Sequence, residues 1–259
     1  MKSIPHISQS QLKQYAKLAQ KKYRQSQKQF LIEGSRLVGE ALDSGWEVEA
    51  LLVSGETPGS GRGMLRSGKV PVFEISGKEL AKLSDTVTSQ GIIGVVNLKD
   101  AREEDLWMLP PGSLVVALDR VSDPGNVGTI IRTCDWFGAD AVVLDRDTVE
   151  FTNPKLTRST MGSMFHLPVY SDVDLPDIIA KAKKKGFTVY ATTLAESKSI
   201  PKKFAGKSII ILGSEAHGVR PELLRQADEL LSIPKFGKAE SLNVAISCGV
   251  ILGSWRLSS

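Results

Sequence analysis

Six short apolar runs follow one another between residue 113 and the C-terminus, and they constrain the fold more than any other feature of the chain. They read LVVAL (114–118), AVVL (141–144), LPVY (167–170), FTVYATT (187–193), SIIILG (208–213) and LLSIP (230–234). Apolar runs of this length without polar alternation are typical of strands that are buried on both faces. Helical patterns at 127–137, 153–164, 175–185, 221–227 and 241–256 lie between most of the runs or after the last. The pattern predicts an α/β domain with a parallel sheet covered on both sides.

Composition places the chain among ordinary globular proteins. Of its 259 residues, 41% are hydrophobic and 24% are charged. No apolar run approaches the length of a membrane span, and the N-terminus lacks the apolar stretch of a signal peptide, so we expect a cytoplasmic protein. Cys134 and Cys248 fall in predicted helices and are expected to be buried thiols. Three histidines and two cysteines without short spacing make no metal site, so no metal is expected.

Positive charge is concentrated at the N-terminus. Residues 1–32 hold seven lysines and arginines and no acidic residue. Five of the cations are spaced by three or four residues, which predicts a single helical face, on which lie Lys13, Lys17, Lys21, Arg24 and Lys28. A stripe of this kind suits the phosphate backbone of a nucleic acid. The alternative is a helix face that is simply solvated.

Two domains are expected. Residues 28–98 resemble a small α/β unit, with a helix at 30–45, a strand at 48–55 and a strand, helix and strand between 70 and 98. A glycine-rich loop is predicted at 54–68, and a charged segment that ends in Pro-Pro-Gly lies within 99–112. We therefore expect an N-terminal domain at 1–105 and a C-terminal domain at 112–259.

Three loops of the C-terminal domain combine glycines with a few polar side chains. DPGNVGTIIR (123–132) carries Asn126 and Arg132, LGSEAHGVRPEL (212–223) carries Glu215, and IPKFGKAESLNVAIS (233–247) carries Ser241 and Asn243. Each follows a predicted strand, and the carboxyl ends of parallel strands are where ligands bind. The loops contain neither a P-loop nor a G-x-G-x-x-G fingerprint.

Simpler explanations exist for each loop taken singly. A hydrolase built on Ser214 and His217 is disfavoured, because the nucleophile elbow G-x-S-x-G is missing. Ser241 or Asn243 can be a helix cap, and the glycines of 212–218 can form a turn. Three such loops in one domain nevertheless favour a shared site.

These three segments resemble the motifs of the SpoU (TrmH) branch of the knotted SPOUT methyltransferases, in the same order across residues 113–257. The segment KKYRQSQKQFLIEGSRLVGEAL (21–42) is similar to the L30e-like substrate-binding domain of members that modify ribosomal RNA. The resemblance implies methylation of a ribose 2′-hydroxyl in RNA, most often ribosomal RNA, with S-adenosyl-L-methionine as cofactor. It further implies a deep trefoil knot and a homodimer.

The resemblance also implies site residues. The catalytic set is Asn126, Arg132, Glu215, Ser241 and Asn243, and the cofactor contacts are Thr192, Gly213, Ile233 and Leu242. The expected RNA contacts are the five cations of the N-terminal stripe and Arg158. The alternatives that remain open are a transfer RNA 2′-O-methyltransferase and a noncatalytic RNA-binding protein that kept the fold.

The reaction needs little covalent machinery. A ribose hydroxyl is a weak nucleophile, whereas a sulfonium methyl is already activated, so the enzyme must align the two and stabilise the developing alkoxide. Arg132 stays protonated and is expected to bind a phosphate and act electrostatically, or else to pair with an acid such as Glu215. Six helical residues put Arg132 roughly 120° from Asn126 around the axis, so the two need not touch. Lys235 departs from the family, which commonly has an apolar residue there.

Overall fold

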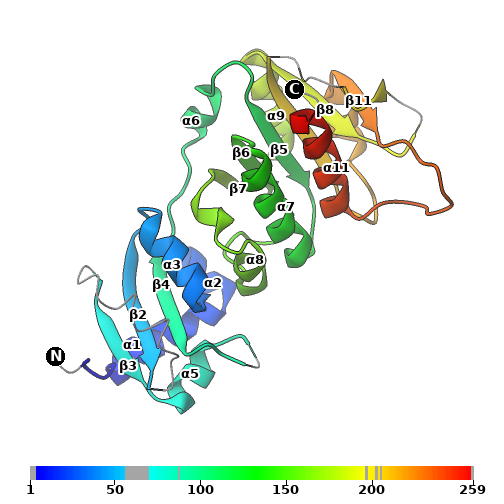
Figure 1. The fold of residues 1–259 in the computed structure, drawn as a ribbon. Helices are drawn as coiled ribbons and strands as arrows, with labels where there is room; N and C mark the ends of the chain where they lie inside the picture. The colour runs from blue at the N-terminus through cyan, green and yellow to red at the C-terminus, as the bar shows by residue number, and fades with distance from the viewer. Residues whose placement is uncertain are drawn as a thin grey trace. The chain divides into compact units, whose positions relative to one another are not determined.

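The computed structural model describes residues 4–55, 70–86, 88–195, 198–201, 204 and 206–257, and the chain divides into two compact units (Figure 1). One unit comprises residues 1–99 and 152–165, and the other comprises 100–151 and 166–259. Residues 152–165 therefore group with the N-terminal unit, although they fall within the C-terminal domain predicted at 112–259. Residues 56–68 of the glycine-rich loop predicted at 54–68 lie outside the described residues.

The second unit is built on a seven-stranded sheet whose order is β7-β6-β5-β10-β8-β11-β9. Each neighbouring pair is parallel, which confirms the predicted sheet. The strands are β5 (Leu114–Asp119), β6 (Ala141–Asp145), β7 (Val169–Val173), β8 (Phe187–Thr192), β9 (Lys198–Ser199), β10 (Lys207–Gly213) and β11 (Glu229–Ser232).

Helices cover this sheet on both faces. They are α6 (Glu103–Trp107), α7 (Pro124–Phe137), α9 (Leu175–Lys184), α10 (Pro221–Gln226) and α11 (Val244–Leu257). Val115 and Ala117 point to the face that packs with α9, while Leu114, Val116 and Leu118 alternate to the other face and are buried as well. Helices α7 and α11 pack against each other, as Figure 1 shows in green and red. Burial on both faces explains why the strand sequences are uniformly apolar.

Side-chain caps set where α7 and α11 begin. Asp123 caps α7 by accepting a hydrogen bond from the backbone N–H of Asn126 at 2.8 Å, and Pro124 occupies the first turn, so α7 starts before the predicted residue 127. Helix α11 starts later than predicted, because Asn243 rather than Ser241 accepts hydrogen bonds from the N–H groups of Ala245 and Ile246. The simple interpretation of Asn243 as a helix cap is therefore correct, and it does not exclude a second role.

The first unit contains a mixed sheet in the order β1-β4-β2-β3, in which only the β2–β3 pair is parallel. Its strands are β1 (Gln29–Glu33), β2 (Val48–Ser54), β3 (Val72–Ile75) and β4 (Ile92–Asn97). Its helices are α1 (Gln9–Ala16), α2 (Lys21–Gln27), α3 (Ser35–Asp43), α5 (Gly77–Leu83) and α8 (Pro154–Ser159), with 3₁₀ turns at Lys17–Ala19 and Ser163–Phe165. Within the described part of the chain, no helix is long and apolar enough to span a membrane.

Two predicted helices of this unit are wrong in part. The helix expected at 30–45 is a strand and a helix, because Phe30 and Ile32 are buried in alternation in β1 and Gly34, with φ of 101°, separates β1 from α3. The helix expected at 153–164 ends at Ser159, since Met161 and Gly162 have positive φ.

The basic N-terminal segment is not one continuous helix. Helix α1 ends at Ala16 and α2 restarts at Lys21 after an extended Gln20, so the predicted single stripe is broken. Arg24 is only 5% exposed, and its guanidinium donates to the carbonyl oxygens of Leu18 and Ala19, both at 2.9 Å. Arg24 therefore supports the fold and is withdrawn from the RNA-contacting residues. Ser8 caps the start of α1 through a capping box with Gln11.

A close backbone approach explains the glycine that ends β10. A side chain at Gly213 would overlap the backbone of Gly218 and Val219, which folds back over it. The loop is closed by a hydrogen bond from the Gly218 N–H to the Ser214 carbonyl at 2.8 Å, and Gly218 has a φ of 64°. Gly213 is thus required by the loop that follows it.

The first prediction concerns this glycine. Gly213→Ala forces Cβ into backbone that cannot move cheaply, and we expect a loss of about 3 kcal/mol in the free energy of unfolding, measured by urea titration. Gly237→Ala is the matched control, since a Cβ at Gly237 meets nothing within 4 Å. Equal stability of the two variants would contradict the close-packing explanation.

Candidate active site

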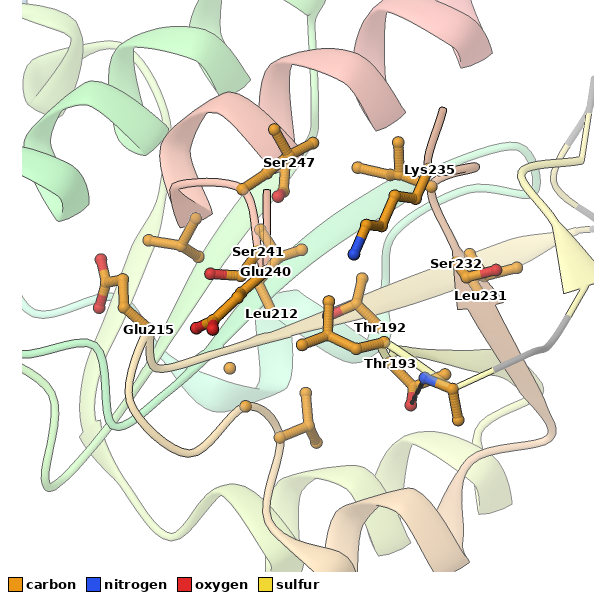
Figure 2. A pocket seen from close by; sticks show the side chains of 18 of the residues that line it. Thr192, Thr193, Leu212, Glu215, Leu231, Ser232, Lys235, Glu240, Ser241 and Ser247 are labelled. Atoms are coloured by element: carbon orange, nitrogen blue, oxygen red, sulfur yellow. Dashed lines mark hydrogen bonds between the residues drawn. The ribbon is translucent and has the colours of Figure 1, made fainter. Parts of the chain in front are cut away.

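A pocket of about 690 Å³ opens at the carboxyl ends of β8, β10 and β11 and at the start of α11 (Figure 2). This volume is typical of a small-molecule site. The lining includes all four predicted cofactor contacts, which are Thr192, Gly213, Ile233 and Leu242. The structure therefore brings these four residues together, while their contact with a cofactor stays a prediction.

The pocket wall combines apolar side chains with polar groups. Leu212, Leu231 and Ile251 provide apolar surface, and Ser241 and Ser247 provide hydroxyl groups. The Thr192 hydroxyl donates to the Ile211 carbonyl at 3.1 Å and is engaged within the sheet. Such a wall suits a ligand with one flat apolar part and one polar part.

A chain of side-chain hydrogen bonds leads from the pocket to helix α7. The Asn126 side-chain N–H donates to the carboxylate of Glu215, which lines the pocket. The Asn126 Oδ1 accepts from Nδ2 of Asn243 at 3.0 Å. Residues from all three predicted loops thus meet at Asn126, which uses both ends of its amide.

Ser241 and Arg132 do not join this chain. Ser241 is an exposed residue of the pocket wall. Arg132 lies on the exposed side of α7, and within the described residues it bonds neither Asn126 nor Glu215. The ion pair between Arg132 and Glu215, one of the alternatives for this arginine, is therefore not formed.

A buried ion network that sequence reasoning missed holds the second loop in place. The Arg220 guanidinium donates to Asp119 Oδ1 at 2.7 Å and also bonds Asp145, while the Arg220 N–H donates to Asp119 Oδ2 at 2.7 Å. Asp119 and Asp145 end β5 and β6 and are 0% and 2% exposed. Burial lowers the pKa of Arg220, but the hydrogen bonds and charges of both carboxylates outweigh it and raise the pKa overall. The signal in the sequence is an aspartate directly after each of two apolar runs, 114–118 and 141–144.

Ser214 and His217, which a hydrolase could use for catalysis, stabilise a turn in this structure. The Ser214 hydroxyl oxygen accepts a hydrogen bond from the His217 backbone N–H at 3.3 Å. The loop interpretation therefore accounts for this pair, in agreement with the missing elbow motif.

Three further predictions concern groups away from the pocket. Arg158 forms an ion pair with Asp85 at 2.9 Å inside the first unit. Cys134 and Cys248 are both buried, as expected. The pKa of Cys134 is raised, mainly by burial and to a lesser extent by a hydrogen bond with Cys248. The described residues contain no group of histidine, cysteine, aspartate and glutamate able to hold a metal ion.

The fold and the pocket define a class of protein. Residues 113–253 match the SpoU rRNA methylase family, and residues 9–94 match the MRM3-like substrate-binding domain. The first match covers more than half of the chain, so the chain belongs to the SpoU methylase family.

Full-length relatives agree with this assignment. The chain is 37% identical over 257 residues to the 23S rRNA (guanosine(2553)-2′-O)-methyltransferase RlmP of Bacillus subtilis, covering 97% of this chain and 98% of that protein. It is similar to the crystal structure of an AdoMet-bound rRNA methyltransferase from Sinorhizobium meliloti, with a TM-score of 0.84, 33% identity and coverage of 98% and 97%. It is also similar to the SpoU methyltransferase AviRb from Streptomyces viridochromogenes in complex with AdoMet, with a TM-score of 0.86, 26% identity and coverage of 96% and 98%.

The second prediction tests the bridging amide. Asn126→Asp keeps the shape but removes the donor to Glu215 and places two carboxylates together, which costs about 1–2 kcal/mol. A negative charge in the first turn of α7 stabilises the helix by about 0.5 kcal/mol. We therefore expect the free energy of unfolding, measured by urea titration, to fall by about 1 kcal/mol. In the matched control Asn153→Asp, the new carboxylate still caps α8, and stability is expected to stay unchanged. Asn126→Asp as stable as this control would show that the bridge contributes nothing.

Proposed function

We propose that this protein transfers the methyl group of S-adenosyl-L-methionine to a ribose 2′-hydroxyl of ribosomal RNA. The observation that carries the proposal is the hydrogen-bond chain from Glu215 through Asn126 to Asn243, which joins all three loop motifs at one pocket. The relatives support it, because RlmP is named a 23S rRNA 2′-O-methyltransferase and the Sinorhizobium meliloti and AviRb structures contain AdoMet.

The pocket fits the cofactor chemically. Its apolar wall, which includes Leu212, Leu231 and Leu242, suits an adenine ring, and Gly213 and Ile233 are the lining residues whose backbone we expect to meet the edge of such a ring. Its polar groups and charges suit the amino-acid end. When bound, S-adenosyl-L-methionine supplies a sulfonium methyl that needs no further activation.

The side chains then have to position the ribose and stabilise negative charge on its oxygen. Asn126 and Asn243 hold each other and Glu215 in fixed orientations, so the polar wall beside the pocket is preorganised. Ser241 offers a hydroxyl from the pocket wall to the ribose or the cofactor. The Arg132 guanidinium, charged and exposed on α7, binds the phosphate of the target nucleotide and stabilises the developing alkoxide through its field.

Recognition of the RNA falls to the N-terminal domain, residues 1–105 in this proposal. Lys13, Lys17, Lys21 and Lys28 are exposed there and are suited to phosphate contacts. Arg158 is an RNA contact in this proposal as well, since its ion pair with Asp85 uses one guanidinium nitrogen and leaves others for a phosphate. A cytoplasmic location belongs to the same proposal, because relatives named as 23S rRNA methyltransferases come from bacteria.

A homodimer is part of the proposal as well. Helix α11 exposes Ile246, Val250 and Leu257 at helical spacing, and α7, which packs against it, exposes Trp136 to 84%. Arg132 lies one turn before Trp136, also on the exposed side. When a second copy is seated on this apolar face, each chain brings Arg132 to the interface, and among the described residues this arginine has no partner in its own chain. We further propose that the C-terminal segment forms the trefoil knot of the family.

A transfer RNA methyltransferase and a noncatalytic RNA-binding protein remain the alternatives. The presence of Asn126, Glu215 and Asn243 in one hydrogen-bonded chain favours catalysis over simple binding. The names of the relatives favour ribosomal RNA over transfer RNA.

The third prediction tests the reaction and the arginine together. Incubation with methyl-labelled S-adenosyl-L-methionine is expected to label ribose 2′-oxygens of undermodified ribosomal RNA and to leave transfer RNA unlabelled. Arg132→Ala is expected to reduce transfer about 100-fold or more at nearly unchanged cofactor affinity, because it removes transition-state stabilisation. Arg146→Ala, which removes a surface ion pair with Asp174, is the matched control and keeps full activity.

Three outcomes would contradict this. No cofactor binding would remove the enzyme proposal, and label on transfer RNA alone would overturn the substrate. A comparable loss of transfer and of cofactor affinity in Arg132→Ala would place Arg132 in the pocket or in the fold.

The fourth prediction tests the dimer. Trp136→Glu puts a charge into the apolar face, and we expect a monomer in analytical ultracentrifugation. Because Trp136 is exposed in the single chain, the free energy of unfolding of the monomer is expected to change by less than about 0.5 kcal/mol. Met108→Glu, at an apolar residue that is 80% exposed next to α6, is the matched control and stays dimeric. A wild-type protein that sediments as a monomer would refute the dimer.

A further inference from the structure

Lysine 235 gives the pocket a positive charge of its own. The charged residues of the lining are Glu215, Glu240 and Lys235, so among the described residues Lys235 is the only lysine or arginine there. Glu215 is already engaged by Asn126. The remaining pair, Lys235 and Glu240, places one charge of each sign in the wall.

The exposed side chain of Lys235 is directed toward the pocket. Figure 2 shows its ammonium pointing into the cavity that Thr192, Glu240 and Ser241 also line. Lys238 lies three residues further along the same segment and is exposed, yet it does not line the pocket. Within the described residues, Lys235 has no ion-pair partner, so its hydrogen-bond donors are available to a ligand.

The charges of the proposed cofactor decide which of its groups Lys235 can bind. Adenosine is neutral, the sulfonium and the amino group are positive, and the carboxylate is the one negative group. An ammonium in the wall repels the sulfonium and the amino group and attracts the carboxylate, so it orients the amino-acid end as well as binding it. An apolar side chain at the same place contributes packing alone.

We propose that Lys235 is a positioning residue of the pocket whose ammonium binds the carboxylate of S-adenosyl-L-methionine. The inference rests on the proposed function, since it assumes that this cofactor occupies the pocket. Because Lys235 is exposed, the pair is partly screened, and its loss is expected to weaken binding roughly three- to tenfold.

Calorimetry with two matched ligands tests the proposal, and it is the fifth prediction. Lys235→Met is expected to raise the Kd for S-adenosyl-L-methionine by roughly three- to tenfold, and to leave unchanged or lower the Kd for decarboxylated S-adenosylmethionine, which lacks only the carboxylate. Lys235→Arg is expected to restore most of the affinity for the intact cofactor. Lys238→Met, the matched control, changes neither Kd.

The outcomes separate this inference from the function on which it rests. A wild-type protein that binds neither ligand removes the proposed function. A wild-type protein that binds both, with Lys235→Met weakening the two ligands equally, shows packing in place of carboxylate binding and overturns the inference alone. Unchanged cofactor affinity together with weaker RNA binding overturns it too, because Lys235 then serves the RNA.

Discussion

The bond between Arg220 and two buried aspartates is the interaction on which the site depends. Asp119 and Asp145 sit at the ends of neighbouring strands with almost no exposure, and two carboxylates buried this close together need a counter-charge. Arg220 supplies it with both its side chain and its backbone N–H. Because Arg220 also ends the loop that began at Gly213, the ion network fixes both the carboxyl ends of β5 and β6 and the loop that lines the pocket.

The polar chain beside the pocket follows from that fixed loop. Glu215 lies between Gly213 and Arg220, so its carboxylate is presented to α7 in a defined position and Asn126 can reach it. Asn243 is positioned independently, since it caps the helix that it starts. Positions set by backbone closure and by helix capping leave little for the side chains to reorganise, which is the condition for electrostatic stabilisation of a reacting oxygen.

The sequence predicts well whatever depends on local pattern. Uniformly apolar strands indicate burial on both faces, and loops of glycines and polar residues after them indicate where the pocket lies. The four lining residues expected to contact the cofactor come from the family resemblance instead. The sequence predicts poorly what depends on partners far along the chain. Arg24 has the spacing of the basic helix face, but the helix is broken at Gln20 and the Arg24 side chain is buried against Leu18. Arg220 has the sequence context of a surface residue, and only the fold brings Asp119, about a hundred residues earlier, beside it. Phe30 and Ile32 form a strand because a sheet is there to receive them.

The hydrogen bond between Asn126 and Asn243 has an electrical consequence. It joins the first turn of α7 to the cap of α11, so two helices of fourteen residues each bring their N-terminal ends together. The macrodipoles of the two helices add at this corner, where each end is equivalent to about half a positive charge. Parallel dipoles repel, and the carboxylate of Glu215, hydrogen-bonded at the same corner, offsets the repulsion. The two half charges together match the single negative charge of Glu215, so this carboxylate holds the two helix ends side by side without leaving net charge at the corner.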